Sequence, residues 1–478
     1  MIYYITIILS LLFIVKILKL LLLCRFYQKQ EIKIITSYPI IGSELQKIKI
    51  FEKNQNQHSI IPVIDSDLIG IISGMNIQLF GINKDSCREI YNQQGVNIDR
   101  SSSSAFKKLG QRSISHTSTF EPLFKIRKNI LINSIKDISN LIQISYKHFD
   151  ILFEEYKLKE VINITNLLDT FIQNVCGDYF WNESNERYIV KYIDKNFELR
   201  NTLVIKTLMI CFQDIYFDSK KILNQIIKFP FPLTKESYRI HKNIKNICNI
   251  FKQMIDDNEG SEVVKYIINK YKKHELSIDI LLDDLIVTTS SGLNIIKLTL
   301  MSILWYLYDE KNLFWKMKFL KEIQMIDYNN YEKIAKCQIL NAFIYEVLRY
   351  ESSFSLLNNQ VINDFDLIIN SKKYKIKKGT MIMPNAYVIH HNNSSWKTHN
   401  LNIFDPTRFI GHEYIGTDFF VSFGKSIRQC PGKKYSLTII RIFTYLFLSK
   451  YPNFKLEKCN NKNIGFSLYS NIDFNITI

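Results

Sequence analysis

The sequence predicts a mainly α (α+β) protein, with a single large helical domain, small β-sheets and an N-terminal transmembrane helix. The chain opens with an apolar run, and helical patterns dominate from about Pro122 to Tyr308. Short strand-like runs are confined largely to Ile60–Ile82 and Val361–Met383. Only 15 Gly and 9 Pro occur among 478 residues, so no stretch is typical of a flexible linker between separate domains. Many helices with few strands therefore favour one mainly helical domain behind the anchor.

The first segment, residues 1–24, is the expected membrane anchor. Only Lys16 and Lys19 interrupt its apolar run, and about 20 mostly apolar residues span a bilayer. Positive charge follows the run, which disfavours the alternative of a cleaved signal peptide; an interfacial helix is the other alternative. The positive-inside rule places the main domain on the cytosolic side. We expect a basic hinge linker at 25–45 and the globular domain at 46–478.

The formal net charge is +17, with a pI of about 9.2. Such a charge is typical of a protein that meets an acidic partner or an anionic membrane face. The alternative is biased composition, which we favour because lysines are spread along an Ile- and Asn-rich chain. No nucleic-acid-binding motif accompanies the charge, so no nucleic-acid partner is expected.

The cysteines are widely spaced and include no CxxC or zinc-like cluster. This spacing in a long chain indicates reduced thiols and a cytosol-facing domain. The eight positions are Cys24, Cys87, Cys176, Cys211, Cys248, Cys337, Cys430 and Cys459.

Several elements can be placed from local signals. Asn83 is a predicted cap for a helix to about Gln93, and the Ser-rich stretch Gly95–Thr119 is typical of a loop. The segment Asp279–Tyr308 is predicted to be a buried core helix, because its uninterrupted apolar stretch is too short to span a bilayer. A further helix is expected from about Glu332 to Tyr350.

The segment from Phe423 to Gly432 reads FGKSIRQCPG, and an amphipathic helix is predicted directly after it. Cys430 lies between Gly424 and Gly432, residues that tolerate unusual backbone geometry. Unpaired N–H groups and the helix dipole would lower the pKa of this thiol. A thiolate is a strongly donating iron ligand. The alternative is that Cys430 is a small buried hydrophobe.

Two further features matter because of their order along the chain. Glu346 and Arg349 have i, i+3 spacing and so share one helix face, although alone they could be an ordinary exposed ion pair. Arg408 follows a turn-forming proline within an apolar frame.

In this order and at these separations, the three features resemble the cytochrome P450 family. The resemblance covers nearly the whole chain. It implies a cytochrome P450-like fold that binds haem b (iron protoporphyrin IX) with Cys430 as the axial iron ligand. It also implies a buried network of Glu346, Arg349 and Arg408 that braces the proximal side of the haem.

The resemblance implies further cofactor-binding residues. Basic residues clamp the haem propionates in this family, and four residues here match such positions. The expected cofactor contacts besides the iron ligand are Arg127, Lys128, Arg428, the weaker candidate His390, and the loop residues Phe423, Gly424 and Gly432.

The chain departs from the family pattern at four positions near the haem. Ser426 replaces a usual glycine, and a non-Gly residue at positive φ costs about 1–2 kcal/mol. Leu123 replaces a usual tryptophan, Ser352 a usual proline and Gln360 a basic residue.

The largest departure lies in the central helix, at the position where the family activates oxygen. Gly292 is kept, but the acid of the family pattern is Asn294 and the threonine is Ile295. Asn can orient a water but cannot titrate, and Ile can do neither. The alternative alignment uses the hydroxyls of Thr288–Ser291 one turn earlier.

By resemblance, the leading hypothesis is an endoplasmic reticulum monooxygenase that inserts one O2-derived oxygen into an apolar small molecule. Its electrons would come from NADPH through a flavoprotein reductase, docked on Lys425, Arg428, Lys433 and Lys434. One alternative is O2-independent rearrangement or dehydration of lipid hydroperoxides, which tolerates loss of the acid–threonine pair. Another is a degenerate haem binder with little activity.

Overall fold

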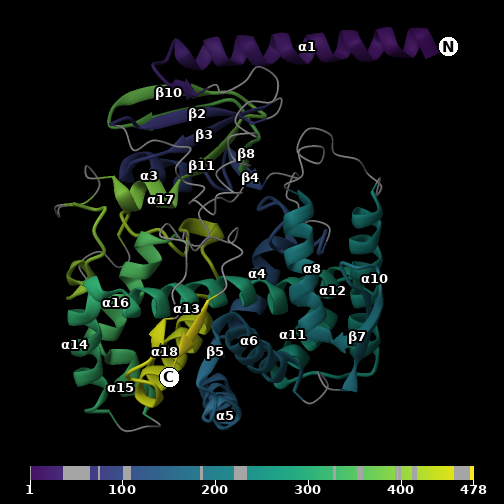
Figure 1. The fold of residues 1–478 in the computed structure, drawn as a ribbon. Coiled ribbons are helices and arrows are strands. Elements are labelled where there is room, and N and C mark those ends of the chain that lie inside the picture. The colour runs from purple at the N-terminus through teal and green to yellow at the C-terminus, as the bar shows by residue number, and fades with distance from the viewer. Residues whose placement is uncertain are drawn as a thin grey trace.

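The computed structural model describes residues 2–35, 65–73, 76–100, 109–182, 187–219, 234–326, 330–352, 359–392, 396, 400–411, 417–456 and 474–477. Helix α1 (Ile2–Gln28) lies along one side of a small β layer, and most other helices gather on the opposite side of that layer (Figure 1). This arrangement is the cytochrome P450-like, mainly α architecture that the sequence predicts.

The N-terminal helix continues past the predicted end of the anchor at residue 24. Most of its apolar side chains between Leu11 and Leu22 are exposed, but Leu20 is buried against the β layer, as are Cys24 and Tyr27. Residues 25–28 of the expected linker are therefore helical, and residues 36–45 lie outside the described part of the chain. The domain boundaries stay predictions.

The main sheet has six strands in the order β1-β2-β3-β11-β8-β4. The predicted strand pair forms an antiparallel hairpin of β2 and β3, and β11 adds in parallel to β3. The expected loop Gly95–Thr119 contains one short strand, β4. The strands are β1 (Lys33–Ile35), β2 (Leu68–Ser73), β3 (Asn76–Gly81), β11 (Met381–Pro384), β8 (Asn359–Val361) and β4 (Ile98–Arg100).

Among the described residues there are three smaller sheets, two of which interrupt the stretch that the sequence predicts as helical. They are the hairpin of β9 (Phe365–Ile369) and β10 (Lys372–Ile376), the hairpin of β6 (Ile189–Ile193) and β7 (Leu199–Leu203), and the sheet of β12 (Lys455–Leu456), β13 (Asn475–Thr477) and β5 (Val161–Asn163).

Helix α3 (Lys84–Asn92) begins where the sequence predicts, because Asn83 and Ser86 form a reciprocal capping box. The remaining helices make up the bulk of the domain. They are α4 (Leu123–Ser134), α5 (Ser139–Tyr156), α6 (Ile164–Trp181), α8 (Val204–Ser219), α10 (Lys235–Asp256), α11 (Glu262–Lys273), α12 (Ile278–Ser290), α13 (Leu293–Tyr308), η3 (Glu310–Asn312), α14 (Leu313–Ile323), α15 (Tyr331–Lys336), α16 (Gln338–Tyr350), α17 (Ala386–His391), η5 (Pro406–Phe409), η6 (Ser426–Arg428) and α18 (Lys433–Lys450).

The predicted helix from Glu332 to Tyr350 is two helices, α15 and α16. Cys337 between them has extended geometry, with ψ 116°. The carboxylate of Glu322 accepts hydrogen bonds from the main-chain N–H groups of the first residues of α16, so it caps this second start. A distant carboxylate therefore stabilises a break that no local pattern marks.

Helices α12 and α13 together form the predicted core helix. In the described part of the chain, Ile278–Tyr308 is the helix that passes a length-and-hydropathy test for a membrane span, and 72% of its apolar window is buried inside the protein. This burial agrees with a core helix. Ser291 and Gly292 interrupt the regular pattern but keep right-handed helical dihedral angles.

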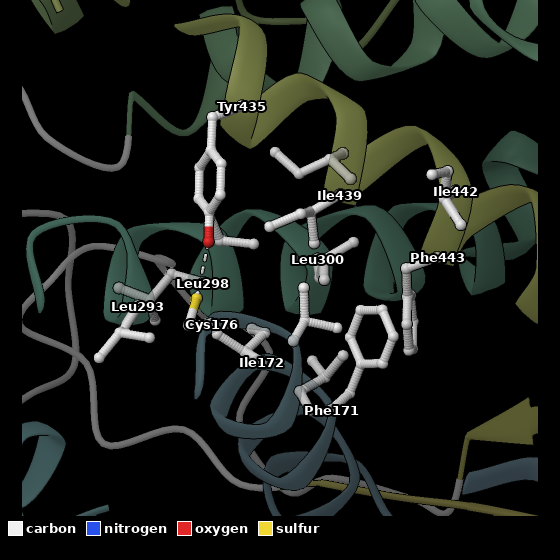
Figure 2. Packing of buried hydrophobic residues seen from close by; sticks show 14 of the residues in the cluster. Phe171, Ile172, Cys176, Leu293, Leu298, Leu300, Tyr435, Ile439, Ile442 and Phe443 are labelled. Carbon is white, nitrogen blue, oxygen red and sulfur yellow. Dashed lines mark hydrogen bonds between the residues drawn. The ribbon is translucent and has the colours of Figure 1, made fainter. Parts of the chain in front are cut away.

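The core beside this helix joins α6, α13 and α18 (Figure 2). Leu293 of α13 and Tyr435 of α18 lie at the same end of this packed group, and Phe443 lies toward the other end. The Tyr435 hydroxyl lies 2.9 Å from the sulfur of Cys176. The first turns of α13 and α18 are thus neighbours.

Candidate active site

The cysteine loop joins η6 to α18 as a tight turn. The main-chain N–H of Cys430 donates to the Phe423 carbonyl at 2.9 Å. Gly424 has φ +65°, and Ser426, where the family has glycine, has φ +61°. The predicted positive φ at Ser426 is therefore confirmed, at a cost of about 1–2 kcal/mol relative to a relaxed backbone.

Among the seven cysteines of the described residues, Cys430 alone is exposed; the other six are buried or half-buried free thiols. Among the described cysteines, Cys430 is therefore the best placed to meet a ligand. Desolvation by the surrounding protein nevertheless raises the pKa of the Cys430 thiol, while the Gly432 main chain, Lys128 and Lys433 lower it by less. The main chain at the start of the helix thus lowers this pKa, as predicted, but desolvation outweighs it and the net shift is upward.

The structure brings together Glu346, Arg349 and Arg408, as predicted. Arg349 Nε lies 2.7 Å from Glu346 Oε2, and Arg408 Nε lies 3.5 Å from Glu346 Oε1. Glu346 and Arg349 are fully buried, which excludes the alternative of an exposed helical pair. Arg349 also donates to the carbonyls of His390 and Leu401, at 2.8 and 3.1 Å. The network thus joins α16 to the segments before and after residues 393–399.

His390 belongs to this structural network and does not face a cofactor, which corrects its assignment as a propionate ligand. Its Nδ1 lies 2.8 Å from the Ser352 hydroxyl, and its Nε2 accepts from the Val421 N–H at 3.1 Å. Both ring nitrogens are therefore occupied by the protein. Ser352, which replaces a usual proline, supplies one of those contacts.

Arg127 also has a different partner from the one predicted. Its side chain is buried, and its Nη2 lies 2.8 Å from Asp284 Oδ2 of α12. Its Nη1 donates to the Thr117 hydroxyl at 2.8 Å, and its Nη2 to the Arg112 carbonyl at 2.5 Å. The guanidinium is committed to these groups, so the structure corrects its assignment as a propionate ligand.

The junction of α12 and α13 has open space beside Gly292. A Cβ atom added to Gly292 would meet only Ile296 Cδ1, at 3.4 Å. Asn294 is 6% exposed, and its Oδ1 accepts from Gln213 Nε2 of α8 at 3.3 Å. Sequence analysis missed Gln213, which no local motif marks.

The alternative alignment retains two hydroxyl residues that are at least partly exposed, Thr288 and Ser291. Thr289 and Ser290 are buried, and the Thr289 hydroxyl accepts from Trp181 Nε1 at 3.3 Å. Ser291 is exposed and lies directly beside Gly292. Ile295 is half-buried.

A family model described as Cytochrome P450 matches residues 37–472 of the chain. The chain belongs to the cytochrome P450 family. Cytochrome P450 85A3 of Solanum lycopersicum is 26% identical over 246 residues, which cover 47% of this chain and 49% of that protein. Abscisic acid 8'-hydroxylase 4 of Arabidopsis thaliana is 30% identical over 173 residues, covering 34% of each chain.

A third relative is more similar over a shorter stretch. Steroid 17-alpha-hydroxylase/17,20 lyase of Squalus acanthias is 32% identical over 116 residues, which cover 23% of this chain and 22% of that protein. The chain therefore spans about half the length, or less, of the curated cytochromes P450 that it matches.

Haem is the cofactor of the cytochrome P450 family, and the charges near Cys430 fit it. Burial and the nearby Arg428 lower the pKa of Arg100 to about 9. The same two causes, with burial the larger, lower the pKa of Lys128. Of the three cations Arg100, Lys128 and Arg428, Arg428 has a carboxylate partner: Asp99 lies 3.0 Å from Arg428 Nη2. A ligand with two carboxylates, such as haem, would relieve this excess of buried positive charge.

Arg100 is a site residue that sequence analysis missed. Among the described residues it makes no ion pair, and its Nη1 donates to the Asn359 side chain at 3.3 Å. Its only signal in the sequence is its position at the end of a short strand-like stretch. Pairing of β4 with β8 is what places it beside Arg428.

The predicted basic docking surface is smaller than expected. Arg428 is buried against Asp99, so it belongs to the interior of this cytochrome P450 and not to the surface. Lys425 lies 2.5 Å from Asp418, and Lys433 lies over the Phe423 ring. A small surface cavity beside the cysteine loop is lined by Phe420, Phe423, Gly424, Lys425, Gln429 and Lys433.

Proposed function

We propose that this chain is a membrane-anchored haem-thiolate monooxygenase that acts on an apolar small molecule, with its domain on the cytosolic face of the endoplasmic reticulum. The observation that carries the proposal is the exposed Cys430 in the loop before α18, a helix whose first turn lies beside the first turn of α13. Bound haem b would supply activation of O2, with electrons derived from NADPH through a flavoprotein reductase.

The chain's own residues have distinct parts in this proposal. The Cys430 thiolate would bind the haem iron, and Glu346, Arg349 and Arg408 would brace the loop that presents it. Arg100, Lys128 and Arg428 would hold the haem carboxylates. The loop residues Phe423, Gly424 and Gly432 would shape the backbone around the thiolate.

Gly292 leaves room for a ligand on the opposite face. Gln213 donates a hydrogen bond to Asn294 Oδ1, which fixes the orientation of the Asn294 amide in the first turn of α13. An amide holds a water or a substrate oxygen but cannot release a proton at neutral pH. Ile295 adds a half-buried apolar side chain. Proton delivery therefore rests on bound water, for which Thr288 and Ser291 are the accessible hydroxyl residues.

The amide of Asn294 also favours a second candidate function, which uses lipid hydroperoxides. Rearrangement or dehydration of a lipid hydroperoxide needs no proton relay and no reductase, so Asn294 and Ile295 would suffice for it. Turnover of a lipid hydroperoxide in the absence of NADPH discriminates between the two. NADPH-dependent product with no hydroperoxide turnover supports the monooxygenase, and the reverse result supports the second function.

The experiment that tests the haem assignment is the absorption spectrum of the reduced, CO-bound protein. A strongly red-shifted Soret band indicates thiolate ligation, and haem content per chain should be stoichiometric. A chain that retains little haem and shows no such band would instead be the degenerate haem binder. Docking of the reductase on Lys425, Lys433 and Lys434 is tested separately by the salt dependence of its reduction rate.

A further inference from the structure

The β6–β7 hairpin is fixed along one edge by side chains of α10. In an antiparallel pair, alternate residues direct their main-chain groups toward the partner strand or away from it. Asn246 donates to the Lys191 carbonyl at 2.7 Å. Asn243 binds both the N–H and the carbonyl of Ile193, each at 2.8 Å. Lys191 and Ile193 therefore direct these groups away from β7, and α10 closes the outer edge of β6.

The outer edge of β7, in contrast, is open. In the β6–β7 ladder Asn201 lies opposite Lys191, and Leu199 lies opposite Ile193. Leu199 and Asn201 therefore also direct their N–H and carbonyl groups away from β6, and no group in the described part of the chain binds them. Both residues are exposed. An exposed edge with unpaired main-chain groups is a template for another strand.

The face of the hairpin that is turned to solvent is largely apolar. Side chains alternate along a strand, and directly opposite residues share a face. Val190 is buried, so the residues beside it in β6 point the other way. Leu199 is 65% exposed and Ile189 is 46% exposed. This outward face carries three cross-strand pairs, two of them aliphatic: Ile189 with Leu203, Lys191 with Asn201, and Ile193 with Leu199.

The open edge of β7 is self-complementary. With a two-fold axis at Asn201, all five residues of β7 pair with the antiparallel strand of a second copy, and Leu199 lies opposite Leu203 of that copy. Each aliphatic pair of one hairpin then continues into an aliphatic pair of the other, which forms two apolar rows across four strands. Cross-strand aliphatic contacts of this kind stabilise sheets. The open edge and the apolar face thus favour the same pairing.

Two other symmetric registers fit less well. An axis at Arg200 places two guanidinium groups directly opposite each other, and like charges at such positions are destabilising. An axis at Leu199 leaves only a short pairing, because Phe197 has φ +64° in the turn that joins the two strands. In the register centred on Asn201, Arg200 lies opposite Thr202 of the second copy, so no like charges meet.

We infer that β7 is a homodimer contact, through which two copies of this chain join their hairpins into one four-stranded antiparallel sheet. Only one strand of each copy takes part, so the interface belongs to the small, transient class that buries less than about 1,200 Å². The hairpin lies at the periphery of the molecule, toward the end remote from α1 (Figure 1). The inference rests neither on haem nor on membrane insertion.

The test places cysteines on the outward face of the hairpin, in the full chain in detergent solution. Asn201→Cys should form an intermolecular disulfide under mild oxidation, because residues at the axis lie about 5.5 Å apart between Cα atoms, within disulfide reach. Lys191→Cys is the matched control on the same face. Its two copies lie three strand spacings apart, about 14 Å, so its dimer yield on a non-reducing gel should be several-fold lower. The unsubstituted chain sets the background from native cysteines.

A second comparison separates edge pairing from contact between the apolar faces. Leu199→Pro removes a main-chain donor from the open edge and leaves the β6–β7 ladder intact, because this N–H points away from β6. In the Asn201→Cys chain it should lower the disulfide yield several-fold, whereas Leu199→Val keeps the donor and should not. Circular dichroism checks that both variants are folded.

Two results would overturn the inference. One is an equal disulfide yield from Asn201→Cys and Lys191→Cys, and the other is an equal yield from the Leu199→Pro and Leu199→Val chains. If Leu199→Pro does not fold, the comparison of the two cysteine positions decides alone.

Discussion

Arg127 of α4 holds Asp284 of α12 in a buried ion pair, 157 positions away in the sequence. The same carboxylate accepts hydrogen bonds from Tyr271 and from the N–H of Ile114, each at 2.5 Å. Arg428 donates to the carbonyls of Ile114 and Thr117, so the loop before α4 is held from two sides. A residue expected to bind the cofactor thus secures the wall of the site.

This relationship predicts a loss of stability with little effect on haem. Arg127→Ala should reduce the free energy of unfolding by about 3–5 kcal/mol, because it leaves Asp284 charged and unpaired in the interior. Urea unfolding of the variant measures the change. Arg127→Ala/Asp284→Ala should be less destabilised than the sum of the single variants. Loss of haem at an unchanged free energy of unfolding would instead support the assignment of Arg127 as a propionate ligand.

Ser426 predicts a stabilising substitution. Ser426→Gly should raise the free energy of unfolding by about 1 kcal/mol, because glycine adopts φ +61° without the penalty that serine incurs. Gly424→Ala, at φ +65°, is the matched change in the opposite direction and should destabilise. Thermal unfolding of both variants, followed by circular dichroism, checks the signs. A neutral or destabilising Ser426→Gly would mean that the serine hydroxyl is needed in the loop.

Cys430 predicts a spectroscopic loss. Cys430→Ser should abolish the red-shifted Soret band of the reduced CO complex, because a hydroxyl does not replace the thiolate ligand. Cys248→Ser, which changes a half-buried free cysteine elsewhere, should leave the band in place. Persistence of the band in Cys430→Ser would reject the axial ligand assignment.

Arg100 predicts opposite effects on stability and on haem binding. Arg100→Met should stabilise the haem-free chain by about 1 kcal/mol, because it removes a buried cation that no carboxylate neutralises directly. The same variant should lose haem faster, measured by transfer to an acceptor apoprotein. Arg88→Met, on the exposed face of α3, should change neither quantity. Slower haem loss from Arg100→Met would contradict its proposed contact with a carboxylate.

If the chain is a monooxygenase, changes at Asn294 and Ile295 should raise the fraction of consumed NADPH that appears as product. Asn294→Asp/Ile295→Thr supplies the titratable acid and the hydroxyl that the chain lacks, so a larger fraction of the NADPH consumed should appear as product. Asn294→Leu/Ile295→Val, which removes the polar group, should show no such gain. A fall in NADPH-independent hydroperoxide turnover, with no gain of coupled product, would favour the second function.

The local signals in the sequence were sufficient to predict the family and most of the secondary-structure elements. The capping box at Asn83, the buried helix through Leu298 and the strand pair ending at Gly81 depend on neighbours along the chain, and all are confirmed. The positive φ at Ser426 could also be expected, because its place between Phe423 and Cys430 identifies the loop. Propensity and periodicity act over one or two turns, so such features can be read without knowing the fold.

The partners of charged residues were decided only by the tertiary structure. A guanidinium at the right position in a motif can bind a cofactor carboxylate or a protein carboxylate. In this fold the packing of α4 against α12 places Asp284 beside Arg127. The same holds for His390, whose nitrogens meet Ser352 and Val421, and for Arg100, which pairing of β4 with β8 brings beside Arg428. Burial makes each unpaired charge costly, so the nearest opposite charge in space, and not in sequence, determines what such a residue does.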